Sequence, residues 1–100
     1  MSDANEFKEQ LLDDCETYQQ LFGRYPIGRD MIIKYGAVEA ARRLIKSTTI
    51  QPGFKRCMQY GQLGRQITME SRILESRFSN LFDSETLNYA KFRIDNWGKI

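Results

Sequence analysis

The chain has 100 residues and a mass of 11.8 kDa, the size of one small domain. Its 41% hydrophobic and 12% aromatic residues are enough for a packed core, which excludes disorder along the whole chain. Histidine is absent, so a Ser-His-Asp triad, a cysteine–histidine pair and a histidine-ligated zinc site are excluded. Two cysteines are too few for a structural zinc site. We therefore expect no catalytic residue, no metal and no cofactor.

The net charge of +2 conceals a division along the sequence. Residues 1–22 carry a net charge of −5, residues 23–77 carry +7, and residues 78–100 are neutral. This pattern has two interpretations. In the first, the acidic segment covers the basic segment within the molecule. In the second, the basic segment is a surface for an anionic partner.

The spacing of apolar residues predicts an all-α fold: a compact single-domain bundle of five or six mostly short helices over residues 1–100. The first predicted helix spans about residues 4–22 and is acidic, with apolar residues recurring every three or four positions. A short helix follows, whose apolar side is predicted to hold Met31, Ile32 and Tyr35.

The middle of the chain is predicted to be helical and basic, with two breaks. Residues 37–46 form a strong predicted helix with basic side chains near its end, where cations are favourable. Residues 47–53 are predicted to form a loop, residues 54–60 a short helix and residues 62–66 a turn. The final predicted helix covers about residues 84–97.

Two later helices begin with residues that favour helix N-termini. Thr68 is a predicted N-cap, and Glu70 then occupies the second helical position, where a negative charge suits the helix dipole. Asp83 or Ser84 is the predicted N-cap of the final helix.

Several short motifs follow one another in an order that resembles a known domain. They are the Gly-Ala-Val-Glu-Ala-Ala stretch at residues 36–41, Gly53-Phe54, Arg77-Phe78 and Leu81-Phe82. Over residues 26–94 the chain resembles a small helical domain of unknown function found in bacterial and phage proteins. The resemblance implies a helical fold and no particular activity. At residues 61–64 this chain has Gly-Gln-Leu-Gly where the family tends towards Gly-Arg-Leu-Asp, and the acidic first helix lies outside the match.

The compartment is predicted from the cysteines and from the distribution of apolar residues. Cys15 and Cys57 lie at core spacing and are expected to be reduced, buried residues. The N-terminal segment is polar and acidic, unlike a secretory signal. The longest apolar run is three residues, so no membrane association is expected and the predicted location is the cytoplasm.

Residues 29–35, Gly36 and residues 37–46 have the order of a helix-turn-helix motif. The second helix carries its basic residues at the C-terminal end, whereas recognition helices contact bases mainly through their N-terminal half. Its first residues, which are mostly alanine and valine, offer almost no donor to a base edge. The motif therefore predicts phosphate contact at most.

By elimination, we expect a non-enzymatic module that binds a protein with an acidic surface, as a small adaptor or inhibitor. One form would be a phage or mobile-element protein that blocks a host nuclease or defence complex. The predicted partner-binding residues are Arg42, Arg43, Lys46, Lys55, Arg56, Arg65 and Tyr60. Tyr60, Tyr89 and Phe92 are expected to be partly exposed, and exposed aromatics beside arginine are typical of binding hot spots. The alternatives are a nucleic-acid-binding accessory protein and a homo-oligomeric structural protein, such as a homodimer.

Overall fold

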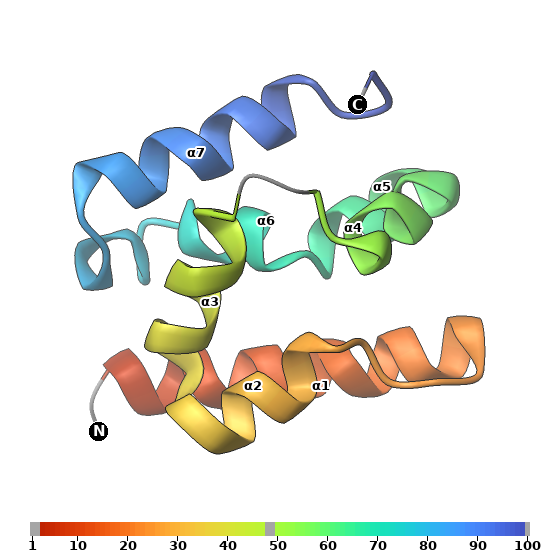
Figure 1. Cartoon of the computed structure of the whole chain (residues 1–100), viewed down its shortest axis with the longest axis horizontal. Helices are drawn as coiled ribbons and strands as arrows, with labels where there is room; N and C mark the ends of the chain where they lie inside the picture. The colour runs from red at the N-terminus through yellow and green to blue at the C-terminus, as the bar shows by residue number, and fades with distance from the viewer. Residues whose placement is uncertain (1–2, 48–49, 100) are drawn as a thin grey trace.

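Figure 1 shows the computed structural model of the chain, in which residues 3–47 and 50–99 are described. The described residues contain helices and no strand, so the predicted all-α class is confirmed. The helices are α1 (Asp3–Phe22), α2 (Gly28–Tyr35), α3 (Ala37–Ile45), α4 (Pro52–Cys57), α5 (Gly61–Gln66), α6 (Met69–Ile73) and α7 (Ser84–Asp95), with short 3-10 helices at Met58–Tyr60 and Ser79–Leu81. Among the described residues, no helix is both long enough and apolar enough to cross a bilayer.

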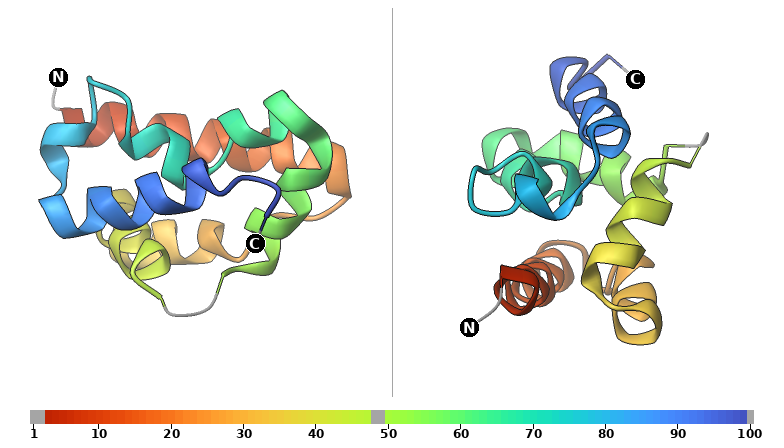
Figure 2. Two further views of the ribbon diagram at one scale, coloured as in Figure 1. Left: turned by 90° about the horizontal axis from the view of Figure 1, so that it is seen from above. Right: turned by 90° about the vertical axis from the view of Figure 1, so that its left-hand side faces the viewer.

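The helices are arranged in three tiers (Figures 1 and 2). The end-on view in Figure 2 shows α1 and α2 side by side in the lowest tier, α6 in the middle and α7 above it. Helix α3 rises from the lowest tier and contacts α1, α2, α6 and α7. The side chains that α3 carries are therefore positioned by all three tiers.

The two helices for which the sequence predicts a capping side chain, α6 and α7, are capped in the structure. The Thr68 side chain accepts a hydrogen bond from the Ser71 N–H at 3.1 Å, which caps α6. Asp83, rather than Ser84, caps α7 by accepting the Thr86 N–H at 2.8 Å. These side chains satisfy backbone donors that the first turn of a helix leaves unpaired.

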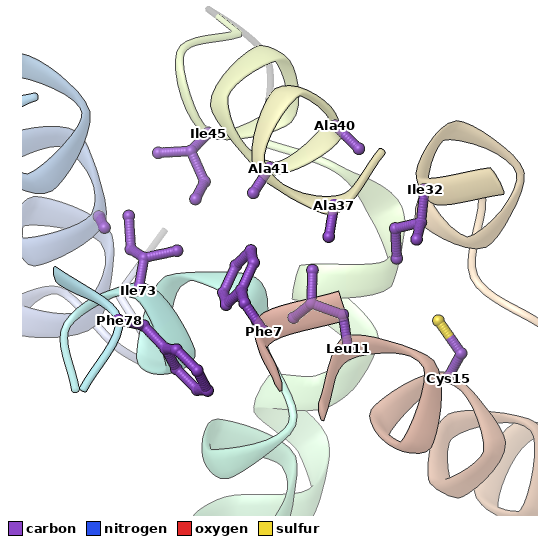
Figure 3. Close-up of a cluster of buried hydrophobic side chains, with 11 residues drawn as sticks. Phe7, Leu11, Cys15, Ile32, Ala37, Ala40, Ala41, Ile45, Ile73 and Phe78 are labelled. Carbon is purple, nitrogen blue, oxygen red and sulfur yellow. The ribbon is translucent and has the colours of Figure 1, made fainter. Parts of the chain in front are cut away.

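The core forms where the alanine-rich side of α3 packs against α1 (Figure 3). Ala37, Ala40 and Ala41 are buried, and their short side chains let neighbouring helices approach closely. Phe7 of α1 is fully buried and packs edge-on against Phe78, with ring centroids 5.1 Å apart. This contact joins the start of the chain to the segment that precedes α7.

The predicted turn at residues 62–66 is wrong, because these residues form α5. Glycines at positions 61 and 64 favoured a turn, since glycine is a poor helix former. In the structure, Gly61 has a φ of +58°, which lets the chain change direction before α5 begins. Gly64 is buried so close to α4 that a Cβ atom there would lie 1.8 Å from the Cys57 carbonyl oxygen. Gly64 therefore allows α5 to pack closely against α4 and does not mark a turn.

Two predicted boundaries shift by a few residues. Helix α4 begins at Pro52, inside the predicted loop at residues 47–53, and proline is favoured at the first helical position. Residues 48 and 49 of that loop lie outside the described residues. Helix α7 ends at Asp95, two residues before the predicted end, and Asn96 occupies the C-cap position.

The close approach at Gly64 predicts a large effect of one methyl group. Gly64→Ala should lower the free energy of unfolding by about 3 kcal/mol or more, because the added Cβ would overlap a backbone carbonyl that cannot rotate away. Urea denaturation followed by circular dichroism measures this change.

Gly53→Ala is the matched control. A Cβ at Gly53 would meet the Tyr18 hydroxyl at 3.5 Å, an ordinary contact, and alanine favours the helix. This variant should be as stable as the wild type or more stable, by up to about 1 kcal/mol. Similar losses in both variants would contradict the packing explanation.

Candidate interaction surface

The predicted partner-binding residues lie in two groups on different elements. The first group is on α3 and the residue after it, and the second is on α4, the following 3-10 helix and α5. The first group consists of Arg42, Arg43 and Lys46, and the second of Lys55, Arg56, Tyr60 and Arg65. Figure 1 shows α3 and the α4–α5 pair towards opposite ends of α6. The candidate site is therefore described group by group.

The second group is partly tied to other parts of the fold. The Arg56 guanidinium donates to the Tyr18 hydroxyl at 3.0 Å, which links α4 to α1. The Tyr60 ring is 44% exposed and packs edge-on against Phe22, with centroids 5.1 Å apart. Lys55 is exposed and Arg65 is half-buried. This group contributes scattered charge and one partly exposed ring.

The first group contains two arginines that share one carboxylate. The Arg42 guanidinium donates to Glu39 Oε1 through Nε at 3.0 Å and Nη2 at 2.6 Å, and Arg43 Nε donates to Glu39 Oε2 at 3.1 Å. These hydrogen bonds hold the pKa of the Glu39 carboxyl below its ordinary value. Both arginine side chains remain about half exposed. The glutamate thus orients two guanidinium groups at the surface.

Cationic side chains lie over the faces of two tyrosine rings, Tyr35 and Tyr25. The Arg43 guanidinium carbon lies 4.1 Å from the centroid of the Tyr35 ring, and Lys34 Nζ lies 5.2 Å from the same centroid. At the other end of α2, Arg29 lies 4.2 Å from the centroid of the Tyr25 ring. Such contacts are cation–π interactions, which keep a charged group stacked on a ring at the surface.

Helix α2 and the outer side of α3 together form an exposed surface that combines arginine, tyrosine and isoleucine. We call it the Arg–Tyr surface; it consists of Tyr25, Arg29, Ile33, Lys34, Tyr35, Arg42 and Arg43. Ile33 is 61% exposed, and Tyr35 is exposed although the sequence predicts it on the apolar side of α2. The predicted site does not include Tyr25, Arg29 or Ile33, although the four-residue spacing of Arg29 and Ile33 is a signal for one helix side.

The end of α3 is held by a buried arginine from α7. Arg93 is 3% exposed and donates to Glu70 Oε2 at 2.9 Å. The same guanidinium donates to the backbone carbonyls of Leu44 at 3.3 Å and Ser47 at 2.8 Å. Because these carbonyls end α3 just beyond Arg42 and Arg43, Arg93 helps to fix the Arg–Tyr surface. Sequence analysis placed Glu70 correctly at the start of α6 but missed this ion pair.

The acidic first helix forms an ion pair with the basic segment at α6. Asp14 is buried and accepts hydrogen bonds from Arg72 Nε at 2.8 Å and Arg72 Nη2 at 2.9 Å. In the described part of the chain, Asp14 is the α1 carboxylate that forms an ion pair. Lys46 instead pairs with Glu85 of α7 at 3.5 Å. Pairing between helices therefore joins α1 to α6 and the end of α3 to α7, whereas Arg42 and Arg43 pair with Glu39 within α3 and stay about half exposed.

The two cysteines are buried and free, as predicted, and both line one small cavity of about 90 Å³. Burial raises the pKa of the Cys15 thiol to about 11 and that of the Cys57 thiol to about 12. The neutral thiol is a poor nucleophile, so this environment opposes reactivity. Within residues 3–47 and 50–99, no group of three or more His, Cys, Asp or Glu side chains is arranged to hold a metal ion.

The predicted helix-turn-helix order is present as α2, Gly36 and α3. The N-terminal half of α3 is directed into the core, however, because Ala37 and Ala40 are buried. A recognition helix needs that half in the DNA groove. The outer side of α3 presents its arginines instead.

Comparison with known proteins finds no matching family model, no significantly similar curated protein and no significantly similar solved structure. The resemblance of residues 26–94 to a bacterial and phage helical domain therefore stays a prediction.

The buried pair of Arg93 and Glu70 predicts a strong single-site effect. Arg93→Met should lower the free energy of unfolding by about 3–5 kcal/mol, because Glu70 would remain buried without its partner. Replacing both residues by methionine should restore much of that loss. Denaturation in urea measures both variants, and a double variant as unstable as the single one would contradict this explanation.

The same pair predicts a pH dependence. Burial raises the pKa of the Glu70 carboxyl, and the hydrogen bond from Arg93 opposes that rise. The folded-state pKa of Glu70 is therefore above the unfolded value of about 4.3. The stability that protonated Glu70 contributes is complete below the unfolded pKa and is lost as the pH rises through the folded-state pKa. Arg93→Met removes the hydrogen bond that opposes the rise in the Glu70 pKa. The loss of unfolding free energy relative to wild type should therefore be larger at about pH 7 than at about pH 5. Equal deficits would contradict the assignment.

The buried thiols should react slowly in the folded protein. A pKa raised by about two units leaves roughly 100-fold less thiolate at Cys15 near neutral pH, and burial restricts access further. Reaction with Ellman's reagent should be slow in buffer and fast for both thiols in urea. Single Cys→Ser variants assign the signals, and fast reaction of either thiol in the folded state would contradict the prediction.

Proposed function

We propose that this protein is a non-enzymatic binding module of the cytoplasm, a small adaptor or inhibitor, whose Arg–Tyr surface contacts an acidic surface of a protein partner. The observation that carries this proposal is the clustering of exposed tyrosine, arginine and isoleucine along α2 and α3. Arg43 and Lys34 lie against the Tyr35 ring, and Ile33 of the same helix as Tyr35 is exposed. Tyrosine and arginine are the residue types enriched in protein interfaces and in their hot spots.

The charge of this surface favours an acidic partner. Four cations belong to it, namely Arg29, Lys34, Arg42 and Arg43. They outnumber the three nearby carboxylates: Glu39, which bridges two of them, Glu16, which accepts the Tyr25 hydroxyl, and Asp30 on α2. An acidic surface would be steered towards these cations and held in register by them. The rings and Ile33 supply apolar contact area, which phosphate binding would not need. This combination supports a protein partner over a nucleic acid.

Charge reversal tests the surface directly. Arg42→Glu combined with Arg43→Glu should weaken binding to labelled poly-glutamate, an acidic polypeptide probe, by at least about tenfold. The stability should change little, because both side chains are about half exposed and their ion pairs are weak. Fluorescence anisotropy measures binding, and circular dichroism checks the fold.

The matched control reverses the same amount of charge in the second group. Lys55→Glu combined with Arg65→Glu should leave poly-glutamate binding within about twofold of wild type. Equal losses in both double variants would show a general effect of net charge and contradict the proposed surface. Labelled DNA and RNA, titrated from about 50 to 200 mM salt, test the alternative: tight binding that collapses over this range would favour a nucleic-acid partner.

A further inference from the structure

A groove of about 540 Å³ lies beside the Arg–Tyr surface. Its wall combines the start of α1, the junction of α2 and α3, and the segment that precedes α7. Val38, Leu81 and Phe82 supply apolar lining, and Tyr35 borders it from the Arg–Tyr surface. The groove is large enough for one or two side chains of a bound segment.

Four charged side chains line the same groove: Lys8, Glu39, Arg42 and Asp83. Asp83 is engaged at the start of α7, where it accepts the Thr86 N–H at 2.8 Å. Glu39 has a different role, because its carboxylate receives the guanidinium of Arg42 within the groove wall. If Glu39 turned away, the cations Lys8 and Arg42 would outnumber Asp83, and the groove would attract an anion.

The Glu39 carboxylate already has the contacts that a bound carboxylate would have. Arg42 and Arg43 converge on it from one side of α3, and Arg43 is held in place by its stacking on Tyr35. Planar guanidinium groups are well suited to recognising a carboxylate. An ion pair as exposed as this one is weakly held, so another carboxylate can replace Glu39 at little cost.

We propose that Glu39 occupies the position of a partner's carboxylate: an acidic peptide segment with an apolar side chain docks in this groove and displaces Glu39 from Arg42 and Arg43. The inference rests on the proposed function and specifies the partner's contact. The partner's carboxylate pairs with the two arginines, and its apolar neighbour packs against Val38, Leu81 and Phe82. Glu39 thereby lowers the affinity for anionic partners while keeping the arginines oriented in the free protein.

The test is Glu39→Gln, measured with a short fluorescent peptide in which glutamates alternate with leucines. Removing the internal competitor should tighten binding roughly two- to fivefold. Glu75→Gln is the matched control, because Glu75 is about as exposed and also lies between two arginines, Arg72 and Arg77. Glu75 does not line the groove, so its variant should bind like wild type.

Three outcomes would overturn the inference. Equal tightening by Glu39→Gln and Glu75→Gln would indicate a general charge effect. Unchanged or weaker binding by Glu39→Gln would show that Glu39 is not a competitor. Equal binding of a peptide with glycines in place of leucines would show that the groove is not used. Val38→Ser should correspondingly weaken binding of the leucine peptide and leave binding of the glycine peptide unchanged.

The same titrations separate this inference from the proposed function. If Arg42→Glu with Arg43→Glu abolishes binding while Glu39→Gln has no effect, the Arg–Tyr surface stands and the displacement of Glu39 is overturned. If neither wild type nor Glu39→Gln binds the acidic peptide, both are overturned. Preferential binding of a single-stranded oligonucleotide over the peptide would also overturn the inference, because the groove would then serve a nucleic acid.

Discussion

The guanidinium of Arg93 lies where α7, α6 and the end of α3 meet, and its hydrogen bonds join α7 to the other two elements. It pairs with Glu70 at 2.9 Å and also donates to the carbonyls of Leu44 and Ser47. A buried charge is costly unless it is fully paired, so this contact forms only when the three elements are in place together. The position of α3 in the bundle therefore depends on a side chain almost fifty residues further along the chain.

The two sides of α3 perform different tasks. The inner side is made of alanines at positions 37, 40 and 41, which let α1 and α2 approach closely in the core. The outer side presents Glu39, Arg42 and Arg43, which are linked to each other by hydrogen bonds. The inner side of α3 is packed in the core, and the end of α3 is hydrogen-bonded to Arg93 of α7. The charged side chains on the outer side are therefore carried by a helix with a fixed position. Such preorganisation lowers the entropy that a binding surface loses when a partner docks.

Charge in this chain is used in two separate ways. The buried pairs join elements distant in sequence: Asp14 of α1 binds Arg72 of α6, and Arg93 binds Glu70. The exposed pairs of Arg42 and Arg43 with Glu39 are local, within α3, and leave both arginines about half accessible. Exposed pairs of this kind add little stability, and in the proposed function they orient the arginines towards a partner. Intramolecular pairing thus accounts for Arg72, while the proposed partner surface concerns Arg42 and Arg43 of the same basic segment.

The sequence by itself determined the all-α class, the long acidic helix, the N-cap at Thr68 and the start of the final helix at Asp83 or Ser84, because these follow from spacing and from contacts within one turn. Only the tertiary structure decided that α5 is a helix, since Gly64 is explained by the Cys57 carbonyl of another element. It also decided how the charges are paired, because Asp14 and its partner are 58 residues apart. The Arg–Tyr surface belongs to this second class: its spacing is visible in the chain, but its exposure depends on which side of α2 the fold buries.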